Sequence, residues 1–372
     1  AKIQSQTEIM KNIGSVKEDL RLERRISVTP DIIKKFSDLK FTVFLEKNYG
    51  EHLGIEDEEY KNKGANFCDT KKEVLEKSEI NLRVNCPTND EVNLIKDQSV
   101  LIGQFDNFSN KEIINKLIKK NVKIFSLILL PRITRAQSMD VLSSQANLAG
   151  YRAVIESVEE FDKVVPMMMT AAGTIVPAKV LVIGAGVAGL QAIATAKRLG
   201  AIVSATDVRS VAKEQVESLG GKFLAVEEAE NLETKEGYAK EASKDFKKKQ
   251  EELLKSLVKN NDIIICTALI PGKKAPRIIS EDMVKSMKSG SIIYDLAVAQ
   301  GGNSAFSEKD KINVINGVKI MGAGNILNNL ALTASNLYAK NLFNFVNNLY
   351  DKEKKEFFIN KDDEIVNKTL IS

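Results

Sequence analysis

The sequence has no tryptophan, one histidine and three cysteines in 372 residues, and these shortages exclude several kinds of site. The cysteines Cys68, Cys86 and Cys266 form no C-x-x-C pair and have no histidine at metal-ligand spacing, so we expect no metal site. An odd number of cysteines in a long chain is typical of reduced thiols in a cytosol-like compartment. The Gly-x-Ser-x-Gly and His-Glu-x-x-His motifs of hydrolases and zinc peptidases are also missing.

The charge of the chain is nearly balanced, with 54 lysines and arginines against 50 aspartates and glutamates. A formal net charge of +4 is too small to indicate binding to nucleic acid or to an anionic membrane. The uncharged stretch 180–196 approaches the length of a membrane span, but three glycines interrupt it, so we interpret it as a buried strand and helix. We expect no direct membrane insertion and no signal peptide, and we interpret residues 1–10 as a tail.

Short apolar segments alternate with helical segments in two separate series, which is the pattern of parallel sheets covered by helices. In the first series we expect strands at Asn12–Ser15, Thr42–Leu45, Ile80–Val84, Val100–Ile102 and Val122–Ser126. The helices expected between them are Pro30–Asp38, Lys71–Glu76 and Lys111–Ile118. In the second series we expect strands at Val180–Ile183, Ile202–Thr206, Lys222–Ala225, Asp262–Thr267, Ser291–Asp295 and Val318–Met321. The predicted fold class is therefore α/β, with two doubly wound Rossmann-like domains of parallel strands.

Two further helices organise these domains. The segment Ser138–Glu159 has small and apolar residues at helical spacing, and we expect it to bridge the domains with its first turn at the cleft. The segment Thr333–Asn347 is amphipathic and is expected to return to the first domain. The predicted boundaries are 11–137 with 330–372 for the N-terminal domain, 138–160 for the bridging helix, and 161–329 for a dinucleotide-binding domain.

Gly184, Gly186 and Gly189 form a Gly-x-Gly-x-x-Gly motif between an apolar strand and an alanine-rich helix. In dinucleotide-binding folds the first glycine permits a tight turn, the second lets the backbone approach the pyrophosphate, and the third lets the helix pack closely on the strand. The helix N-terminus then offers unpaired N–H groups and a positive dipole end to the phosphates. The helix predicted over Leu190–Leu199 ends at Gly200, a typical C′ residue.

Asp207 follows the second strand of this domain, about 20 residues after the first glycine of the motif. A carboxylate at this position accepts hydrogen bonds from ribose hydroxyls and repels a 2′-phosphate, which favours NAD over NADP. Arg209 leaves the alternative open, because an arginine nearby can accommodate that phosphate.

Four segments of the sequence are distinctive beyond these general patterns. They are Pro131–Val154, Gly184–Arg209, Lys213–Phe223 and Thr267–Gly272. Through them the chain resembles, from about residue 11 to its end, the NAD(H)-binding component of proton-translocating NAD(P) transhydrogenases, which is related to the alanine dehydrogenases.

This resemblance implies a homodimer of two-domain subunits with NAD(H) in the cleft between the domains. It also implies two kinds of partner: a component that holds NADP(H), to which hydride passes directly, and a membrane-spanning component that couples the transfer to proton movement. The chain would then lie in the cytoplasm, attached through its partners to the cytoplasmic face of the inner membrane.

The resemblance also assigns residues at the nicotinamide. Arg132 and Ser143 would bond the carboxamide, Asp140 would orient Arg132, and Gln137 would reach between the two cofactors. Ser138 and Met139 fall inside this set and are carried over as cofactor-binding residues. Without the resemblance, Asp140 and Arg132 would be an N-cap and a surface ion pair.

At the adenosine end the resemblance covers a second group of residues. These are Val187, Asp207, Val208, Arg209, Gly237, Tyr238, Gln250 and Leu269. Gly237 and Tyr238 lie in the strongly charged segment Glu227–Gln250, which is either an extra helix with a flexible arm or a functional flap. If the segment is a flap, Tyr238 would close over the bound nucleotide.

A freestanding alanine dehydrogenase is the main alternative enzyme. Members of that group resemble this chain but use a Lys-x-Lys-Glu-Pro segment and a Leu-His-Leu-Ala-like strand end for substrate binding and acid–base chemistry. The corresponding segments here, Leu82–Pro87 and Leu101–Asp106, contain neither the lysine nor the histidine, and His52 is expected in a surface loop. Direct transfer between two nicotinamides needs no such acid or base. A nucleotide-sensing module without activity is the third hypothesis.

Overall fold

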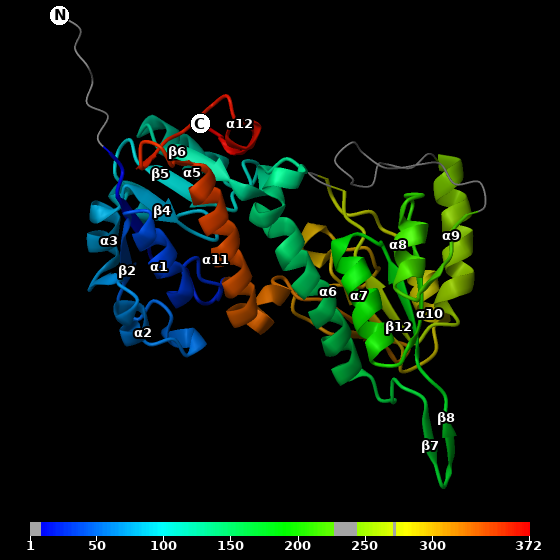
Figure 1. The fold of residues 1–372 in the computed structure, drawn as a ribbon. Coiled ribbons are helices and arrows are strands. Elements are labelled where there is room, and N and C mark those ends of the chain that lie inside the picture. The colour runs from blue at the N-terminus through cyan, green and yellow to red at the C-terminus, as the bar shows by residue number, and fades with distance from the viewer. Residues whose placement is uncertain (1–8, 227–243, 271–272) are drawn as a thin grey trace, which may run out of the picture. The chain divides into compact units, whose positions relative to one another are not determined.

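The chain forms two units, each built on its own parallel β-sheet, in a computed structural model that describes residues 9–226, 244–270 and 273–372 (Figure 1). The first unit comprises Ala1–Gln145 together with Leu330–Ser372, and the second comprises Ala146–Asn329. The C-terminal segment therefore belongs to the same unit as the start of the chain.

The first unit contains a six-stranded sheet in the order β3-β2-β1-β4-β5-β6, with all neighbouring strands parallel. Its strands are β1 (Asn12–Ser15), β2 (Thr42–Glu46), β3 (Asn66–Cys68), β4 (Ile80–Leu82), β5 (Val100–Gly103) and β6 (Lys123–Ser126). This is the doubly wound order, in which the chain reverses direction between β1 and β4. A short antiparallel pair, β16 (Tyr350–Asp351) with β17 (Glu356–Phe357), lies outside that sheet.

Helices cover both faces of this sheet, and the strands are accordingly apolar on both faces. The helices are α1 (Pro30–Asp38), α2 (Asp57–Asn62), α3 (Lys71–Lys77), α4 (Asn89–Leu94), α5 (Lys111–Lys119), α11 (Ala331–Asn348) and α12 (Glu364–Thr369). In β5, Ile102 packs in the core under α1 and α11, whereas its neighbour Leu101 packs in the core under α3, α4 and α5. Successive residues of a strand alternate between faces, so each core takes every second side chain.

The second unit contains a seven-stranded sheet in the order β11-β10-β9-β12-β13-β15-β14. Its strands are β9 (Lys179–Ile183), β10 (Ile202–Thr206), β11 (Lys222–Phe223), β12 (Ile263–Cys266), β13 (Ile292–Asp295), β14 (Asn313–Ile315) and β15 (Val318–Met321). Only the edge strand β14 runs antiparallel to its neighbour in the described sheet. A separate hairpin, β7 (Met168–Thr170) with β8 (Gly173–Ile175), extends from this unit (Figure 1).

The helices of this unit again divide between two cores. They are α6 (Val141–Glu160), which enters from the first unit, α7 (Val187–Arg198), α8 (Ala212–Ser218), α9 (Lys244–Val258) and α10 (Glu281–Ser286). Val180 and Val182 of β9 pack with α6, α7 and α8, whereas Leu181 and Ile183 pack with α9 and α10. The second sheet is thus also doubly wound, and the α/β fold class expected from the sequence is confirmed.

Several elements differ from the sequence-based expectations. The three-residue strands β3, β7, β8 and β14 were not predicted, because segments this short show no clear alternation of apolar and polar residues. The bridging helix begins at Val141 rather than Ser138, since Thr134–Met139 form a 3₁₀ helix that ends at Asp140 in an extended conformation. Other 3₁₀ helices are Glu51–Leu53, Leu127–Leu129, Val298–Gln300 and Ile326–Leu330.

Candidate functional site

The Gly184–Gly189 loop runs from the end of β9 into α7, and its last glycine, Gly189, lies in the first turn of that helix. Gly184 has a φ of 95°, in the left-handed region, which lets the chain turn at once from strand to helix. A Cβ on Gly189 would lie 1.8 Å from the carbonyl oxygen of Gly184, so the helix can approach the strand only with glycine here. A Cβ on Gly186 would meet only the guanidinium of Arg209, at 3.8 Å, so the outer side of the loop is open.

Asp207, at the end of β10, is bonded to this loop. One oxygen of its carboxylate accepts a hydrogen bond of 2.7 Å from the backbone N–H of Ala185. Arg209 donates to the same carboxylate through its backbone N–H at 2.8 Å and through Nε at 3.0 Å and Nη2 at 2.9 Å. Both side chains are largely buried, at 6% exposure for Asp207 and 12% for Arg209. Asp207 thus holds the loop in place, and its carboxylate accepts the hydrogen bonds that the Arg209 side chain donates.

Residues from neighbouring elements also hold the loop. The Thr267 hydroxyl donates to the Gly184 carbonyl at 2.7 Å. The buried amide of Asn303 accepts from the backbone N–H of Ala268 at 3.0 Å and donates to its carbonyl at 2.8 Å. Asn303 was not predicted from the sequence, because a side chain that bonds a distant backbone leaves no periodic signal. Of the other residues assigned to the adenosine end, Leu269 is 41% exposed beside this segment.

Two further residues of that group, Val208 and Gln250, lie in the described part of the chain. Gln250 is partly buried on α9, and Val208 follows Asp207 in the segment after β10. Gly237 and Tyr238 lie outside the described residues, so the structure does not bear on the proposed flap.

The Pro131–Ser143 turn of the first unit surrounds a hollow of about 330 Å³. Its lining residues are Pro131, Arg132, Ile133, Thr134, Ala136, Gln137, Asp140 and Ser143. The structure therefore brings together the four residues that the resemblance assigns to the nicotinamide. Met139 instead packs in the core of the unit, and Ser138 is exposed next to the hollow without lining it.

Asp140 caps the N-terminus of α6. Its Oδ1 accepts the backbone N–H of Ser143 at 3.0 Å and its Oδ2 accepts the Ser143 hydroxyl at 2.6 Å. An aspartate at this position satisfies an unpaired N–H of the first turn and complements the helix dipole. The N-cap interpretation of Asp140 is thus correct, and the same bonds hold the Ser143 side chain at the edge of the hollow.

Two family patterns cover almost the whole chain. The pattern described as "Alanine dehydrogenase/PNT, N-terminal domain" matches residues 14–149, and "Alanine dehydrogenase/PNT, C-terminal domain" matches residues 153–372. The chain belongs to the alanine dehydrogenase/PNT family. The segment Leu330–Ser372 falls in the C-terminal pattern, although it folds with the first unit.

The more similar relatives belong to the transhydrogenase branch of the family. The first portion of the NAD(P) transhydrogenase alpha subunit of Rhodospirillum rubrum is 49% identical over 358 residues, which cover 94% of this chain and 93% of that protein. A crystal structure of transhydrogenase from Sinorhizobium meliloti superposes with a TM-score of 0.88 at 42% identity, over 97% of this chain and 98% of that one. An L-alanine dehydrogenase shares the fold, with a TM-score of 0.80 at 21% identity over 97% and 95% of the chains.

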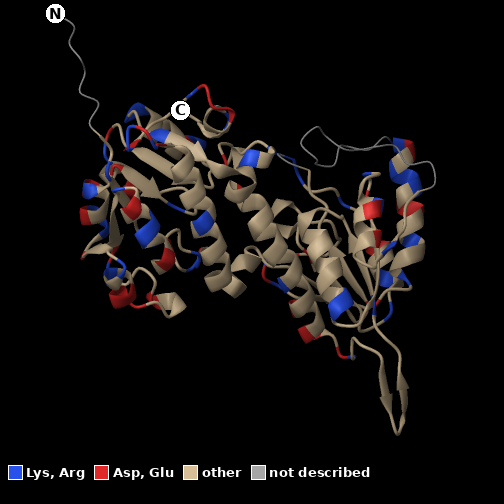
Figure 2. Ribbon diagram, in the orientation of Figure 1, with Lys and Arg blue, Asp and Glu red and all other residues tan. Residues whose placement is uncertain are grey.

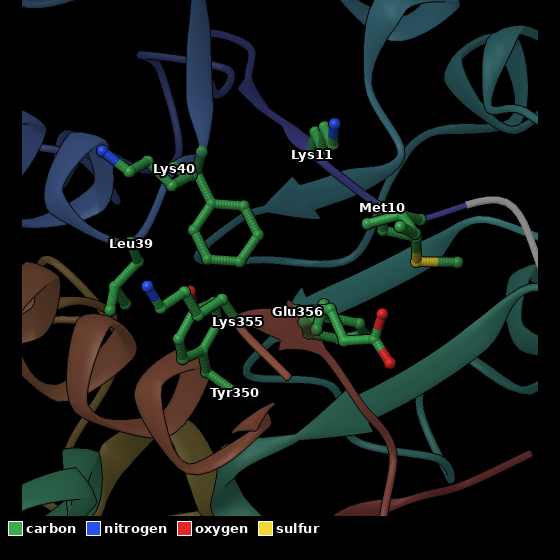
Figure 3. A pocket seen from close by; sticks show the side chains of 10 residues that line it. Met10, Lys11, Leu39, Lys40, Tyr350, Lys355 and Glu356 are labelled. Atoms are coloured by element: carbon green, nitrogen blue, oxygen red, sulfur yellow. The ribbon is translucent and has the colours of Figure 1, made fainter. Parts of the chain in front are cut away.

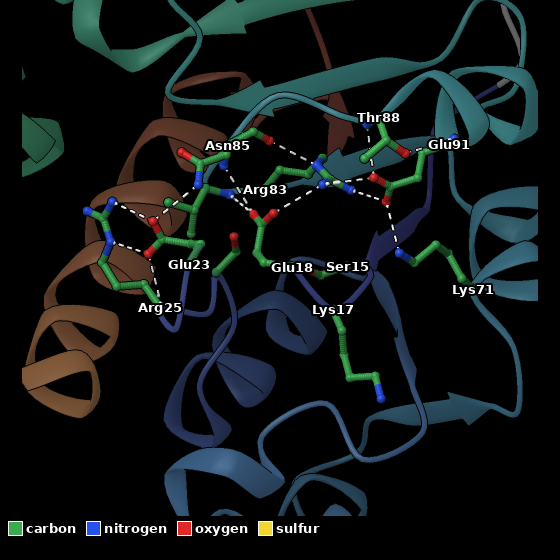
Figure 4. A network of polar contacts seen from close by, with 12 residues as sticks. Ser15, Lys17, Glu18, Glu23, Arg25, Lys71, Arg83, Asn85, Thr88 and Glu91 are labelled. Atoms are coloured by element: carbon green, nitrogen blue, oxygen red, sulfur yellow. Dashed lines mark hydrogen bonds and ion pairs between the residues drawn. The ribbon is translucent and has the colours of Figure 1, made fainter. Parts of the chain in front are cut away.

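A network of buried charges lies after β1 and β4, which are neighbouring strands of the first sheet (Figure 4). Arg83 donates to Glu91 at 2.7 Å and to Glu18 at 3.1 Å. Glu18 also accepts the backbone N–H groups of Val84 and Asn85, at 2.7 and 3.1 Å. The side chains of Arg83, Glu18 and Glu91 are at most 7% exposed.

The pKa values of Glu18 and Glu91 shift in opposite directions. Burial raises the pKa of Glu18 above its usual value, although Arg83 opposes the shift. Burial acts to raise the pKa of Glu91 as well, but Arg83 and the backbone N–H of Thr88 outweigh it and the pKa is lowered. Arg83 is thus the buried cation that both carboxylates share.

Replacing Arg83 with methionine should lower the free energy of unfolding by about 3–5 kcal/mol, because two buried carboxylates lose their partner. Chemical denaturation at neutral pH measures the loss. The deficit should shrink toward about pH 4, where protonation removes the unpaired charges. Lys71→Met is the control, because Lys71 reaches Glu91 at 3.3 Å from a position 36% exposed and should cost less than about 1 kcal/mol. An Arg83→Met protein as stable as the control would contradict this account.

A second pocket in the described residues is small. A pocket between residues 9–11, 39–41 and 350–357 has a volume of only about 30 Å³, which holds roughly one water molecule (Figure 3). Within the described residues, no group of three or more His, Cys, Asp and Glu side chains is placed to hold a metal ion. Among the same residues, no helix is both long enough and apolar enough to cross a membrane.

Proposed function

We propose that this chain is the NAD(H)-binding component of a proton-translocating transhydrogenase. It holds NADH for direct hydride transfer to NADP⁺ on a partner component, and a membrane component couples the transfer to proton movement. The chain is then cytoplasmic and is attached to the inner membrane only through its partners. The observation that carries this proposal is the hollow shared by Arg132, Gln137, Asp140 and Ser143, in a chain whose similar relatives are transhydrogenase subunits.

The loop geometry fits a dinucleotide. The open side of Gly186 and the N-terminus of α7 present free space and backbone N–H groups to the pyrophosphate. NAD(H), when bound, supplies the hydride; the residues around it bind and orient. Arg132 and Ser143 would hold the carboxamide, and Gln137 would reach toward the second cofactor. Asp140 would orient Arg132, and it is itself bonded to Ser143.

The Asp207–Arg209 pair supports NAD over NADP. A 2′-phosphate next to Asp207 would meet a buried carboxylate, and Arg209 already donates three hydrogen bonds to that carboxylate. Recruiting Arg209 to a phosphate would leave Asp207 buried with fewer partners. The ribose hydroxyls of NAD carry no charge and meet no such repulsion from Asp207.

Reconstitution tests the proposed function. The chain is combined with NADP(H)-binding and membrane components of a transhydrogenase, and hydride exchange between NADH and an oxidised NAD analogue is followed in the presence of NADP(H). We expect exchange with the assembled mixture and none with this chain alone. Alanine-dependent reduction of NAD⁺ by the chain alone, or no exchange in a mixture shown to assemble, would overturn the proposal.

The same proposal includes a homodimer, and the β7–β8 hairpin is the surface that we assign to it. No charged residue occurs between Lys163 and Lys179, and the hairpin is accordingly without blue or red in Figure 2. Met169, Met167 and Val176 are 82%, 59% and 76% exposed. In the described residues the two strands pair only with each other. Because the patch lacks charge, two copies can meet through it without repulsion and bury the methionines.

Met169→Asp should weaken this dimer by about 100-fold, because two carboxylates would have to be buried at a two-fold contact. Light scattering across a dilution series gives the dissociation constant. Phe108→Asp is the control, since Phe108 is 95% exposed in the first unit and its replacement should leave the dimer unchanged. A wild-type chain that stays monomeric at about 100 µM, or a Met169→Asp dimer of unchanged affinity, would contradict the assignment.

A further inference from the structure

Three asparagines of α11 face the Pro131–Ser143 turn. Asn341, Asn344 and Asn348 are separated by three and four residues, so they lie on one face of the helix, which we call the asparagine face. Asparagine is a weaker helix former than alanine or leucine, so helix stability does not account for three of them in α11. Their hydrogen bonds give a different reason for their presence.

The centre of the turn is bonded to two of these residues. The main-chain carbonyl of Ser138 accepts a hydrogen bond from Nδ2 of Asn341 at 2.9 Å and another from Nδ2 of Asn344 at 3.0 Å. Asn341 is only 8% exposed, and its Oδ1 accepts the Ser144 hydroxyl at 2.7 Å, which fixes the orientation of the amide. Ser138 lies between Gln137 and Asp140, which both line the hollow. The two hydrogen bonds to its carbonyl therefore fix the backbone that carries these lining residues.

The beginning of the turn is bonded to the third asparagine. Arg135 donates from Nη1 to Oδ1 of Asn348 at 2.9 Å, and it makes an ion pair of 2.7 Å with Asp363. Asp363 is the N-cap of α12, and Nδ2 of Asn348 donates to its carboxylate at 3.3 Å. The turn is therefore tied at two points to the C-terminal segment of the chain.

We propose that the asparagine face of α11 positions the turn, so that Gln137, Asp140 and Ser143 hold the geometry that hydride transfer requires. This inference rests on the proposed function, because the role of the turn at the nicotinamide is itself proposed. None of the three asparagines is among the residues lining the hollow. They act through the Ser138 carbonyl and Arg135, and are positioning residues.

The test uses Asn344→Ala, the double variant Asn341→Ala/Asn344→Ala, and Asn347→Ala as a matched control. Asn347 lies on the same helix with similar burial but bonds neither Ser138 nor Arg135. Alanine favours the helix, so the changes should not unfold α11.

In the reconstituted enzyme, the rate of hydride exchange at saturating NADH should fall about 3-fold in the single variant and about 10- to 30-fold in the double variant. NADH affinity should change less than about 2-fold, and Asn347→Ala should match the wild type.

A second measurement does not depend on activity. Amide hydrogen exchange over Thr134–Asp140 in the full chain without nucleotide should become about 10-fold faster in the double variant and stay unchanged in Asn347→Ala. Unchanged amide protection of the turn would overturn the positioning role. So would a rate of hydride exchange that falls only in proportion to NADH affinity. Should the wild-type mixture transfer no hydride, the proposed function fails, while amide exchange still decides whether the asparagine face fixes the turn.

Discussion

Gly189→Ala should weaken NADH binding by about 100-fold, which corresponds to roughly 2.7 kcal/mol. The added Cβ would lie 1.8 Å from the Gly184 carbonyl oxygen, a backbone atom that cannot move without shifting the loop. The N-terminus of α7 must then move away from β9, and the N–H groups that face the phosphates move with it. The same displacement should lower the free energy of unfolding by about 1–3 kcal/mol. Fluorescence titration with NADH and thermal unfolding measure the two effects.

Gly186→Ala separates the loss of binding from the loss of stability. A Cβ at Gly186 meets no atom closer than 3.8 Å, and the φ of −77° suits alanine, so the free protein should be as stable as the wild type. The methyl group would nevertheless occupy the open side of the loop, and NADH affinity should fall about 10-fold. Wild-type affinity in both variants would show that this loop does not hold the phosphates.

The sequence predicted those parts of the molecule that depend on local patterns. Strands such as Ile202–Thr206 and helices such as Pro30–Asp38 were predicted with the bounds that the structure shows, because apolar periodicity and the Thr29–Pro30 start are local signals. The glycine motif and the acid after β10 were also recognisable from spacing. The strand order then follows from the alternation of strands and helices, since right-handed crossovers leave few alternatives.

Contacts between segments that are distant in the chain were not predictable in this way. Asn341 and Ser138 are 203 residues apart, and a side-chain bond to a backbone carbonyl has no counterpart in the sequence pattern. The asparagine spacing in α11 was visible, but polar residues on a helix usually indicate a solvated face. The Arg83 network was equally hidden, because a charged residue after a strand is ordinarily exposed.

The Arg132–Ser143 segment shows where sequence reasoning left two interpretations open. Spacing favoured an N-cap at Asp140, whereas the family resemblance favoured a role at the nicotinamide. The hydrogen bonds show the cap, and Asp140 lines the same hollow as Gln137 and Arg132. The two roles are compatible, because a capped helix start is a rigid support for a ligand-binding side chain.

Asp140→Asn should lower the rate of hydride transfer by about 100-fold while NADH affinity changes less than about 3-fold. Asparagine is as good an N-cap as aspartate, so its Oδ1 can still accept the Ser143 N–H and the fold should be preserved. The second oxygen, which accepts the Ser143 hydroxyl at 2.6 Å, is replaced by an NH₂ group that cannot accept that proton. Ser143 then loses its fixed orientation at the hollow. Single-turnover transfer in the reconstituted enzyme and equilibrium NADH binding give the two quantities.

Two variants decide how the Asp140→Asn result is explained. Ser143→Ala removes the hydroxyl and should reproduce most of the loss in rate, again with little change in affinity, if orientation of Ser143 is the cause. Asp140→Ala removes the cap as well, and should also lower the free energy of unfolding by about 1 kcal/mol. If NADH binding collapses in Asp140→Asn and the rate falls only in proportion, the carboxylate serves binding in general, and its assignment to the nicotinamide is wrong. A rate loss confined to transfer would instead mean that the helix cap of α6 also orients the group that touches the reacting end of NADH.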